Sequence, residues 1–396
     1  MFLIYFLLSF TTPELDDINA KLNQHNNVKI YKSNSKALEH EKAGSKNYFT
    51  PVVSLGIKNI PYNFSYQDSA MTGNFFSISQ RFKLNDKFDK KKQVISSMIK
   101  DNKIKEDFFK KQSFIKISKN YYKIYFLNEK LKEIKKKKVL YKDLLVYFND
   151  IKKFKKISET KIILLSFKIK KIDLLIEKIL RKKDLLLSEI EKISEINKKE
   201  LVFNFKSINK NIDNWKIETI FFESLKHRLV KNKINILKNE YRYFKTLNKP
   251  DFKFSFAWIQ RLEQKMSNGN DLFSLTVSMT LPFWDNAGIY QAHKRLELVN
   301  EAELNLDKIT YIINSDSGKN EKIFKSYQKS LKICKETLKP IINNLMELNS
   351  ENLSYDNSDF TDIIELKELM LDTSIECTDL SIKAVETYFD YLFTRI

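Results

Sequence analysis

Glycine and proline are scarce in this chain of 396 residues, which contains six of each. Neither residue occurs between Asn74 and Lys249. Because both residues end helices and shape turns, their absence over such a length favours long helices. Nine of the twelve fall within residues 44–73 and 250–288. These two windows therefore mark the places where helix gives way to another structure.

Cysteine and histidine are also few, with two and four copies. The histidines are scattered over His25, His40, His227 and His293. No stretch has the spacing of a metal site, a phosphate-binding loop or an activated nucleophile. The sequence therefore predicts a protein that is not an enzyme and that holds neither a cofactor nor a metal ion.

Long apolar runs are missing apart from Met1 to Phe10. This run is too short to cross a bilayer as a helix, which takes about 20 residues. It fits the core of a signal peptide, although no basic residue precedes it and no clear cleavage site follows.

Acidic residues are outnumbered, because 70 lysines and arginines face 50 aspartates and glutamates and give a net charge of +20. Such a charge invites a nucleic-acid-binding interpretation. The lysines, however, are spread along helical patterns beside isoleucine, phenylalanine and asparagine, and no segment resembles a base-reading module. Solvated helix faces are the favoured interpretation, with no nucleic-acid partner.

What the two windows contain is alternation of apolar with small or polar residues, at the period of a β-strand. The apolar sets are Val53, Leu55, Ile57, then Phe76, Ile78, Phe82, then Phe252, Phe254, Phe256, Trp258, then Phe273, Leu275, Val277, Met279 and Leu281. In the second window each strand is about ten residues long, as a tilted strand needs to cross a bilayer. Two membrane hairpins are predicted.

The alternative is a pair of ordinary hairpins that pack on a soluble helical core. The apolar residues of the helical segments are already matched to one another, which disfavours this packing. Four strands cannot close a barrel, and an open edge is not tolerated in lipid. Membrane strands would therefore need several chains in one barrel, and three chains would supply twelve strands.

The two halves repeat a unit of helix, strand, strand and long helical hairpin at a spacing of about 200 residues. The chain resembles the outer membrane efflux protein family, the TolC-like proteins, and in particular its metal and cation efflux branch. The resemblance is carried by PVVSLGIKNIP with SAMTGNFFSISQRF, KPDFKFSFAW with SLTVSMTLPFWDNAG, and YDNSDFTDIIE with AVETYFDYL.

This resemblance implies a mainly α protein with membrane β-structure. Long antiparallel helical hairpins would form an α-barrel tunnel through the periplasm, and four strands per chain would join a trimeric twelve-stranded β-barrel in the outer membrane. It also implies a homotrimer in outer-membrane lipid, with a periplasmic adaptor (membrane fusion) protein and an inner-membrane pump as partners. The expected segments are a signal peptide at 1–15, a helix leading to the barrel at 16–49, a first β-hairpin at 50–83, a helical hairpin with an equatorial segment at 84–249, a second β-hairpin at 250–284 and a second helical hairpin at 285–396.

The last hairpin carries two apolar seams with spacing of three and four residues. Its first helix would run from Ala287 to about Ser350, about 96 Å at 1.5 Å per residue, with an interruption near Gly318 and a kink at Pro340. Antiparallel pairing matches Leu348 with Ile363, Leu345 with Leu366, Ile341 with Met370, Leu338 with Thr373 and Cys334 with Cys377. The two cysteines are either small buried apolar residues or a disulfide, which an oxidising compartment would allow.

The turn of this hairpin is the candidate gate. By the resemblance, Tyr355 corresponds to a tyrosine that latches the periplasmic end, and Asp362 and Glu365, with Asp359 nearby, correspond to acidic rings at the constriction. Three copies would favour cations there. The alternative is that these carboxylates only cap the helix and complement its dipole. This chain is two residues shorter there than the family pattern and lacks its glycine.

At the first periplasmic turn, the basic residues Lys152, Lys153, Lys155 and Lys156 either meet the adaptor or form a solvated turn. The predicted function is a passive exit duct of a tripartite efflux system for metal cations or small toxic molecules. The alternatives are a soluble basic coiled-coil scaffold, a nucleic-acid-binding protein, or the same fold in type I protein secretion.

Overall fold

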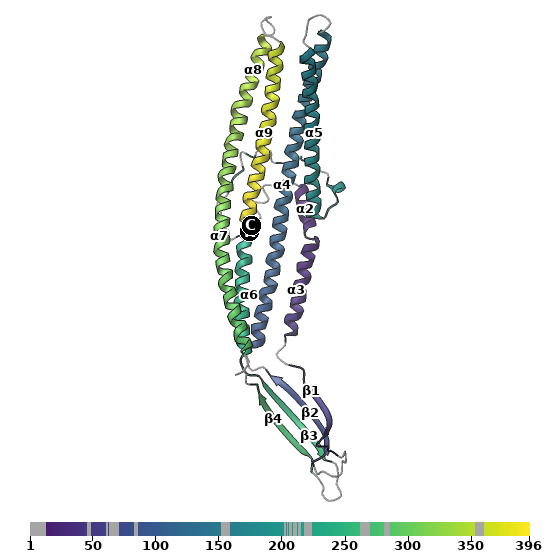
Figure 1. Cartoon of the computed structure of the whole chain (residues 1–396), viewed down its shortest axis with the longest axis vertical. Coiled ribbons are helices and arrows are strands. Elements are labelled where there is room, and N and C mark those ends of the chain that lie inside the picture. The colour runs from purple at the N-terminus through teal and green to yellow at the C-terminus, as the bar shows by residue number, and fades with distance from the viewer. Residues whose placement is uncertain are drawn as a thin grey trace. The chain divides into compact units, whose positions relative to one another are not determined.

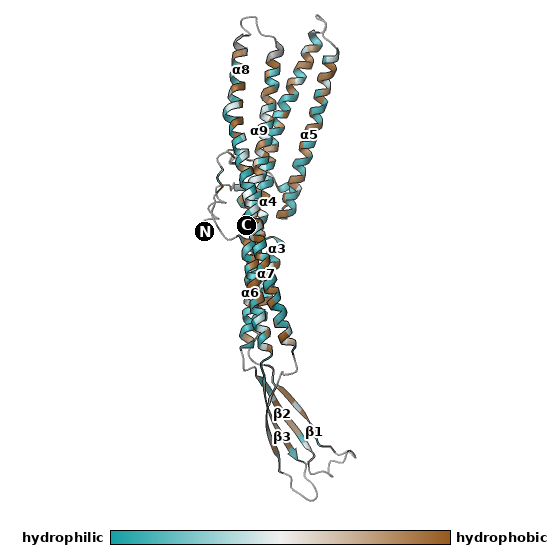
Figure 2. Ribbon diagram, turned by 60° about the vertical axis from the view of Figure 1, so that its left-hand side comes forward, coloured by the Kyte–Doolittle hydropathy of each residue, from teal (hydrophilic) through white to brown (hydrophobic). Residues whose placement is uncertain are grey.

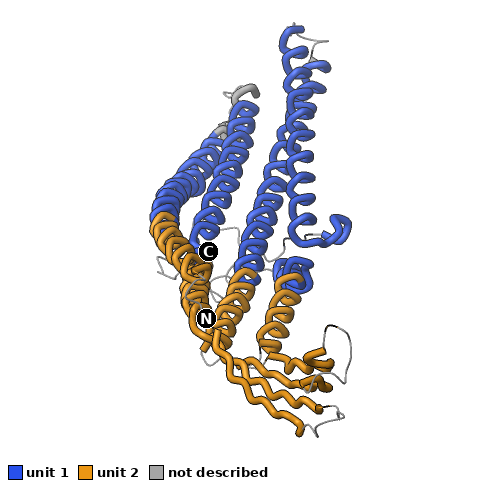
Figure 3. Tube along the Cα trace, turned by 60° about the horizontal axis from the view of Figure 1, so that its bottom comes forward, with its two compact units in different colours: residues 1–29, 106–226, 309–396 blue, residues 30–105, 227–308 orange. Residues whose placement is uncertain are grey.

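The structure is a computed structural model of the whole chain (Figure 1). It describes residues 13–45, 49–60, 62, 71–82, 86–151, 159–201, 203, 205, 208, 212, 215–217, 224–261, 270–280, 286–352 and 360–396, with the side chains of 151, 349–352 and 360–362 left aside. The chain divides into two compact units (Figure 3). Unit 1 comprises residues 1–29, 106–226 and 309–396, and unit 2 comprises residues 30–105 and 227–308. The segment expected to be a signal peptide lies almost wholly outside the described residues.

Unit 2 contains one antiparallel sheet of four strands in the order β1-β2-β3-β4. The strands are β1 (Val52–Lys58), β2 (Gly73–Phe82), β3 (Phe252–Arg261) and β4 (Leu272–Met279). The first and last strands pair only on one side in this sheet, and β2 joins the two hairpins by pairing with β3. The two strand pairs predicted from the alternation are confirmed.

The helical part of unit 2 is made from α3 (Asn26–Gly44), α6 (Leu225–Leu247) and the first parts of α4 (Lys87–Ile151) and α7 (Ala287–Ile333). Ile234 and Leu237 of α6 form a buried cluster with Val299 of α7. Hydrophobic and hydrophilic residues are mixed along these helices (Figure 2).

Unit 1 contains α2 (Pro13–Leu22), α5 (Glu159–Ser194), the short helix η1 (Lys198–Glu200), α8 (Lys339–Asn352), α9 (Phe360–Arg395) and the later parts of α4 and α7. Its core is aromatic. Tyr122, Trp215, Phe324, Tyr388 and Phe389 pack together, with the rings of Trp215 and Tyr388 4.8 Å apart. Among the described helices, none has a stretch long and apolar enough to cross a membrane.

Two helix boundaries differ from the expectation. The segment expected to be one helix contains two, α2 (Pro13–Leu22) and α3 (Asn26–Gly44). The chain turns between them at Asn23–His25, and Nδ1 of His25 accepts a hydrogen bond from the backbone N–H of Asn27 at 3.0 Å. Helix α7 is not interrupted near Gly318, so that expectation was wrong. A lone glycine costs a helix about 1 kcal/mol, which the surrounding long helix tolerates.

The irregular stretch lies instead directly before Pro340, where Cys334–Leu338 form a π-helical turn, η3, between α7 and α8. Proline has no N–H to donate to the carbonyl four residues earlier, which weakens the α-helical pattern at that point. In η3 the N–H of Lys339 bonds to the carbonyl of Cys334, five residues back. A π-turn takes one residue more than an α-turn, so it shifts the phase of every side chain that follows.

This shift corrects the predicted seam beyond Cys334. Leu338, Ile341, Leu345 and Leu348, expected to face α9, are exposed, and Leu348 is 57% exposed. Ile342, one position out of phase, is instead 6% exposed. Since α8 and α9 pack side by side, the residue that the π-turn moves inward replaces Ile341 in the seam. The row expected inside the hairpin is left uncovered on unit 1.

Candidate functional site

The four strands place most of their large apolar side chains on one face of the sheet and their hydroxyl and basic side chains on the other. The pairing register aligns Val53 with Ile78, Phe256 and Leu275, and the next row aligns Leu55 with Phe76, Trp258 and Phe273. We call this side the apolar face. We call the opposite side the small face, because two of its rows consist mostly of hydroxyl or small residues. These rows are Ser54, Ser77, Ala257, Ser274 and Val52, Ser79, Ser255, Thr276; a third row on this face, Gly56, Phe75, Ile259, Leu272, is apolar.

The apolar face is uncovered. Leu55 is 76% exposed and Leu275 77% exposed, and Phe254, Phe256 and Phe273 are exposed as well. A soluble protein rarely leaves an apolar patch of this extent in water. None of the described helices of unit 2 covers it, so the sheet needs an environment or a partner that buries this face.

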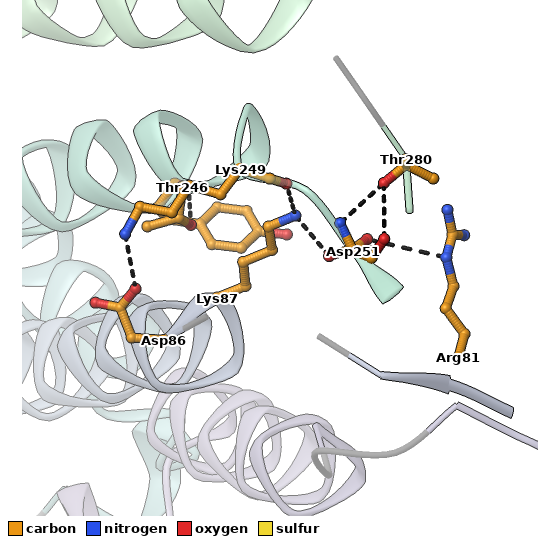
Figure 4. Close-up of polar contacts among 8 residues, drawn as sticks. Arg81, Asp86, Lys87, Thr246, Lys249, Asp251 and Thr280 are labelled. Atoms are coloured by element: carbon orange, nitrogen blue, oxygen red, sulfur yellow. Dashed lines mark hydrogen bonds and ion pairs between the residues drawn. The ribbon is translucent and has the colours of Figure 1, made fainter. Parts of the chain in front are cut away.

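A buried ion pair fixes the junction between the sheet and the helices (Figure 4). The ammonium group of Lys87, at the start of α4, lies 2.7 Å from Oδ1 of Asp251 and donates to the carbonyl of Lys249 at 2.7 Å. Arg81 reaches the same carboxylate at 3.9 Å, and the hydroxyl of Thr280 accepts from the N–H of Asp251 at 2.8 Å. The junction therefore ties the end of β2 and the start of β3 to the edge of β4.

Sequence reasoning missed this junction. Lys87 and Asp251 are 164 positions apart, and each sits in a segment rich in other charges. The only available signal was that each residue stands beside the end of a predicted strand in the two repeated halves.

Two glycines allow close backbone approach in unit 2. A Cβ at Gly73 would lie 2.4 Å from the backbone oxygen of Gln260, across the β2–β3 pair. A Cβ at Gly288, in the first turn of α7, would meet the side chain of Asn248 after α6. By contrast, a Cβ at Gly56 in β1 would meet nothing within 4 Å.

The expected gate falls mostly outside the described residues. Tyr355 and Asp359 lie there, as do the proposed adaptor lysines Lys152, Lys153, Lys155 and Lys156. Asp362 lies in the first turn of α9, and its side chain is not described. Glu365, one turn later, is exposed.

A ladder of ion pairs joins α4 to α9 within unit 1. The pairs are Lys119–Asp390 at 2.7 Å, Lys123–Glu386 at 2.5 Å, Lys130–Asp379 at 2.6 Å and Lys137–Asp372 at 2.6 Å. Each step along α4 is matched by an equal step backwards along α9, and the last three pairs are one heptad apart. The ladder thus fixes an antiparallel register between the two helical hairpins.

The ladder continues into a cluster around Glu368. This carboxylate accepts a hydrogen bond from the hydroxyl of Tyr141 and lies 3.3 Å from Lys137 and 3.4 Å from Lys168. Burial raises the pKa of Glu368, but the Tyr141 hydroxyl and the two lysines outweigh it and hold the pKa below its ordinary value. The pKa of Tyr141 is raised by burial and by its hydrogen bond to Glu368. Sequence reasoning missed this cluster, although the heptad spacing of lysines on α4 and acids on α9 was a usable signal.

Cys334 and Cys377 form a disulfide in the structure, with their Cα atoms 6.0 Å apart. The register predicted for this pair places them opposite each other, and Cys334 opens the π-turn. Among the described residues, no three or more histidine, cysteine, aspartate and glutamate side chains gather as a metal site would require.

Solved structures share this fold. The chain matches the CmeC outer membrane channel of Campylobacter jejuni with a TM-score of 0.71 and 10% identity, covering 96% of this chain and 85% of that one. A membrane protein from Pseudomonas aeruginosa matches with a TM-score of 0.75 and 8% identity, covering 98% of this chain and 94% of that one. The outer membrane protein VceC of Vibrio cholerae matches with a TM-score of 0.71 and 9% identity, covering 96% of this chain and 95% of that one.

Neither a scan against protein-family models nor a search of curated proteins gives a match. At such low identities the likeness concerns the fold. The chain therefore has long helical hairpins and a four-stranded antiparallel sheet in the arrangement of outer-membrane channels. The matched structures are, by their own descriptions, an outer membrane channel, a membrane protein and an outer membrane protein.

Proposed function

We propose that the chain is one subunit of a trimeric outer-membrane exit duct that conducts substrates passively from a pump and an adaptor to the exterior. The observation that carries the proposal is the sheet, which has one largely apolar, uncovered face and one face with small, hydroxyl-bearing and basic side chains. In a membrane barrel the apolar face meets lipid and the small face lines the lumen.

The free edges of the sheet support a barrel shared between chains. Strands β1 and β4 are both edge strands. Because four is an even number, β4 runs opposite to β1, so β4 of one chain can pair with β1 of the next in the same antiparallel manner. Such a head-to-tail contact closes into a ring, and three chains give the twelve strands that the resemblance implies.

Unit 1 offers a matching head-to-tail contact between helices. Helix α5 exposes Ile163, Phe167, Leu174 and Leu185 along one side. The row that the π-turn leaves uncovered, Leu338, Ile341, Leu345 and Leu348, runs from η3 along α8. We assign these two rows to each other in neighbouring copies, so that the helices close into a tunnel as the strands close into a barrel.

The remaining parts of the proposal concern the ends of the tunnel. Tyr355, Asp359, Asp362 and Glu365 would form the closed constriction. Lys152, Lys153, Lys155 and Lys156 would meet a periplasmic adaptor, which links the duct to an inner-membrane pump. The resemblance suggests metal cations or small toxic molecules as substrates, selected by the pump rather than by the duct.

The test is membrane fractionation of the expressed protein, followed by mass determination in detergent. We expect it in the outer-membrane fraction, with a protein mass three times the 47.1 kDa of one chain. Replacing Leu345 with glutamate should reduce the trimer fraction, whereas the same change at the exposed position Asn344 should not. A water-soluble monomer would overturn the proposal.

A further inference from the structure

The charges on the sheet are all of one sign. The described strands contain no aspartate or glutamate, and their basic residues are Lys58, Arg81, Lys253 and Arg261. By the pairing register, all four lie on the small face. A membrane strand avoids charged side chains on the side that faces lipid, so this segregation is the one that a barrel wall with the small face toward the lumen would have.

These residues stand at the two ends of the small face. Lys58 and Arg261 are both aligned with Gly73, at the end away from the helices. Arg81 and Lys253 are paired with each other at the end next to α4. Three rows lie between these ends. Two carry serine, threonine and alanine with Val52 at one edge, and the third carries Gly56, Phe75, Ile259 and Leu272, so none of them adds a charge.

Only Arg81 has a carboxylate partner on this face. It lies 3.9 Å from Asp251, which Lys87 also neutralises. Among the described residues, no carboxylate lies within ion-pair distance of Lys58, Lys253 or Arg261. The ammonium of Lys58 rests over the ring of Phe75 at 4.8 Å, and the guanidinium of Arg261 contacts the sulfur of Met71 at 3.8 Å. Neither contact removes the positive charge.

We propose that the small face gives the barrel lumen a positive potential, so that this part of the duct favours anionic solutes over cations. The inference rests on the proposed function, since it requires that the small face lines a lumen. Asp271 accepts a hydrogen bond from the backbone N–H of Arg261 at 3.3 Å but makes no ion pair with its guanidinium. Three cations per chain without an ion-pair partner among the described residues would place nine around one closed barrel. Low-dielectric walls lined by one sign of charge concentrate the field inside a channel.

This preference is opposite to that of the candidate gate, where Asp362 and Glu365 would favour cations. A conductance measurement across the whole duct would mix the two. A positive potential in the barrel also makes a metal cation a poor match for this part of the duct and an anionic or anion-complexed solute a better one. The test must therefore report the potential within the sheet alone.

Such a test uses Ser77→Cys, which places one thiol in the middle of the small face between the two basic groups. The native cysteines are bonded to each other and leave no competing thiol. The reconstituted protein is treated separately with an anionic sulfonatoethyl and a cationic trimethylammonioethyl methanethiosulfonate. The rate at which each reagent modifies Ser77→Cys is divided by its rate with a free thiol in solution, and the two normalised rates are compared as a ratio. A potential of about one kT per unit charge would make the anionic reagent about sevenfold faster in relative terms.

Two changes should reduce the preference for the anionic reagent. The triple replacement Lys58→Gln, Lys253→Gln and Arg261→Gln should bring the ratio close to one, and Lys90→Gln on α4 is the matched control that should leave it unchanged. Without any charge replacement, raising the salt to about 1 M shortens the screening length to about 3 Å and should reduce the ratio as well. The salt arm keeps the test decisive if the triple variant does not assemble.

The neighbouring substitution Ile78→Cys, on the apolar face, separates failure of the inference from failure of the proposed function. We expect it to be protected from both reagents by lipid. If Ser77→Cys reacts, Ile78→Cys does not, and the ratio is one or favours the cation, the inference is wrong and the barrel stands. If both positions react alike, or only Ile78→Cys reacts, the sheet does not form a barrel wall and both proposals fail.

Discussion

The ammonium nitrogen of Lys87 lies 2.7 Å from Oδ1 of Asp251, so the first residue of α4 is bonded to the residue that precedes β3. Lys87 is only 3% exposed. The contact holds the two repeated halves of the chain in a fixed relation where their strands begin and end. Asp251 is further held by backbone bonding to Thr280 after β4.

We expect Lys87→Met to cost about 3 kcal/mol of stability, because removing one partner leaves a nearly buried carboxylate with only the distant Arg81. The denaturant midpoint of the detergent-solubilised protein measures the loss. Lys90→Met is the control, since Lys90 makes a partly exposed pair with Asp86 at 3.6 Å that contributes about 0.5 kcal/mol or less. Equal midpoints for the two variants would show that the Lys87 pair does not stabilise the junction.

The two strand glycines predict opposite outcomes for the same substitution. Gly73→Ala should separate β2 from β3 locally, since its Cβ would lie 2.4 Å from the backbone oxygen of Gln260 and backbone cannot swing aside as a side chain does. Gly56→Ala should be neutral or stabilising by up to about 1 kcal/mol, because the site is open and alanine restricts the unfolded chain. The fraction of protein that assembles into trimer in detergent compares them. Similar losses for both would argue against the β2–β3 register.

The disulfide between Cys334 and Cys377 should be present in protein isolated without reductant, as peptide mass mapping would show. It closes a loop across 43 positions, which in the chain-entropy model stabilises the folded state by about 4 kcal/mol. Reductant should therefore lower the denaturant midpoint of the native chain and leave that of the Cys334→Ser, Cys377→Ser double variant unchanged. Ready alkylation of both cysteines without reductant would contradict the bond.

The strands could be predicted from the sequence because aromatic residues alternate with small or polar ones along Phe252 to Trp258, which is the period of a strand with two different faces. The π-turn could not. The heptad rule assumes an unbroken α-helix, and nothing in the residues before Pro340 says that the missing N–H would be accommodated by one extra residue rather than by a kink. That single residue exchanges Ile341 for Ile342 in the seam.

The site was predictable only where it follows from local pattern. The alternation alone assigns Lys253 to the face opposite Phe252, but it does not reveal that Arg261 and Lys58 lie in the same row, since this depends on the register of β1 and β3 against β2. The Tyr141 and Glu368 contact is likewise set by the pairing of two distant helices. Long-range register is the information that composition and spacing do not contain.

The cluster around Glu368 predicts how stability changes with pH. Its pKa is lower in the folded chain than its ordinary value of 4.5, so the unfolded chain binds more protons as the solution is acidified. The stabilisation is therefore fully present above about pH 4.5 and is lost as the pH falls through the folded pKa. Denaturant midpoints measured from about pH 3 to pH 7 should fall less steeply for Glu368→Gln than for the native chain.

Tyr141→Phe removes the hydroxyl that donates to Glu368 and should raise the pKa of this carboxyl, which moves the acid-induced loss to higher pH. Glu365→Gln, an exposed position one turn earlier on α9, should give a profile parallel to that of the native chain. The three variants separate the cluster from general acid destabilisation, because only those at Glu368 and Tyr141 change the shape of the profile. Parallel profiles for all of them would mean that the Tyr141, Lys137 and Lys168 contacts do not hold the carboxylate in its charged form.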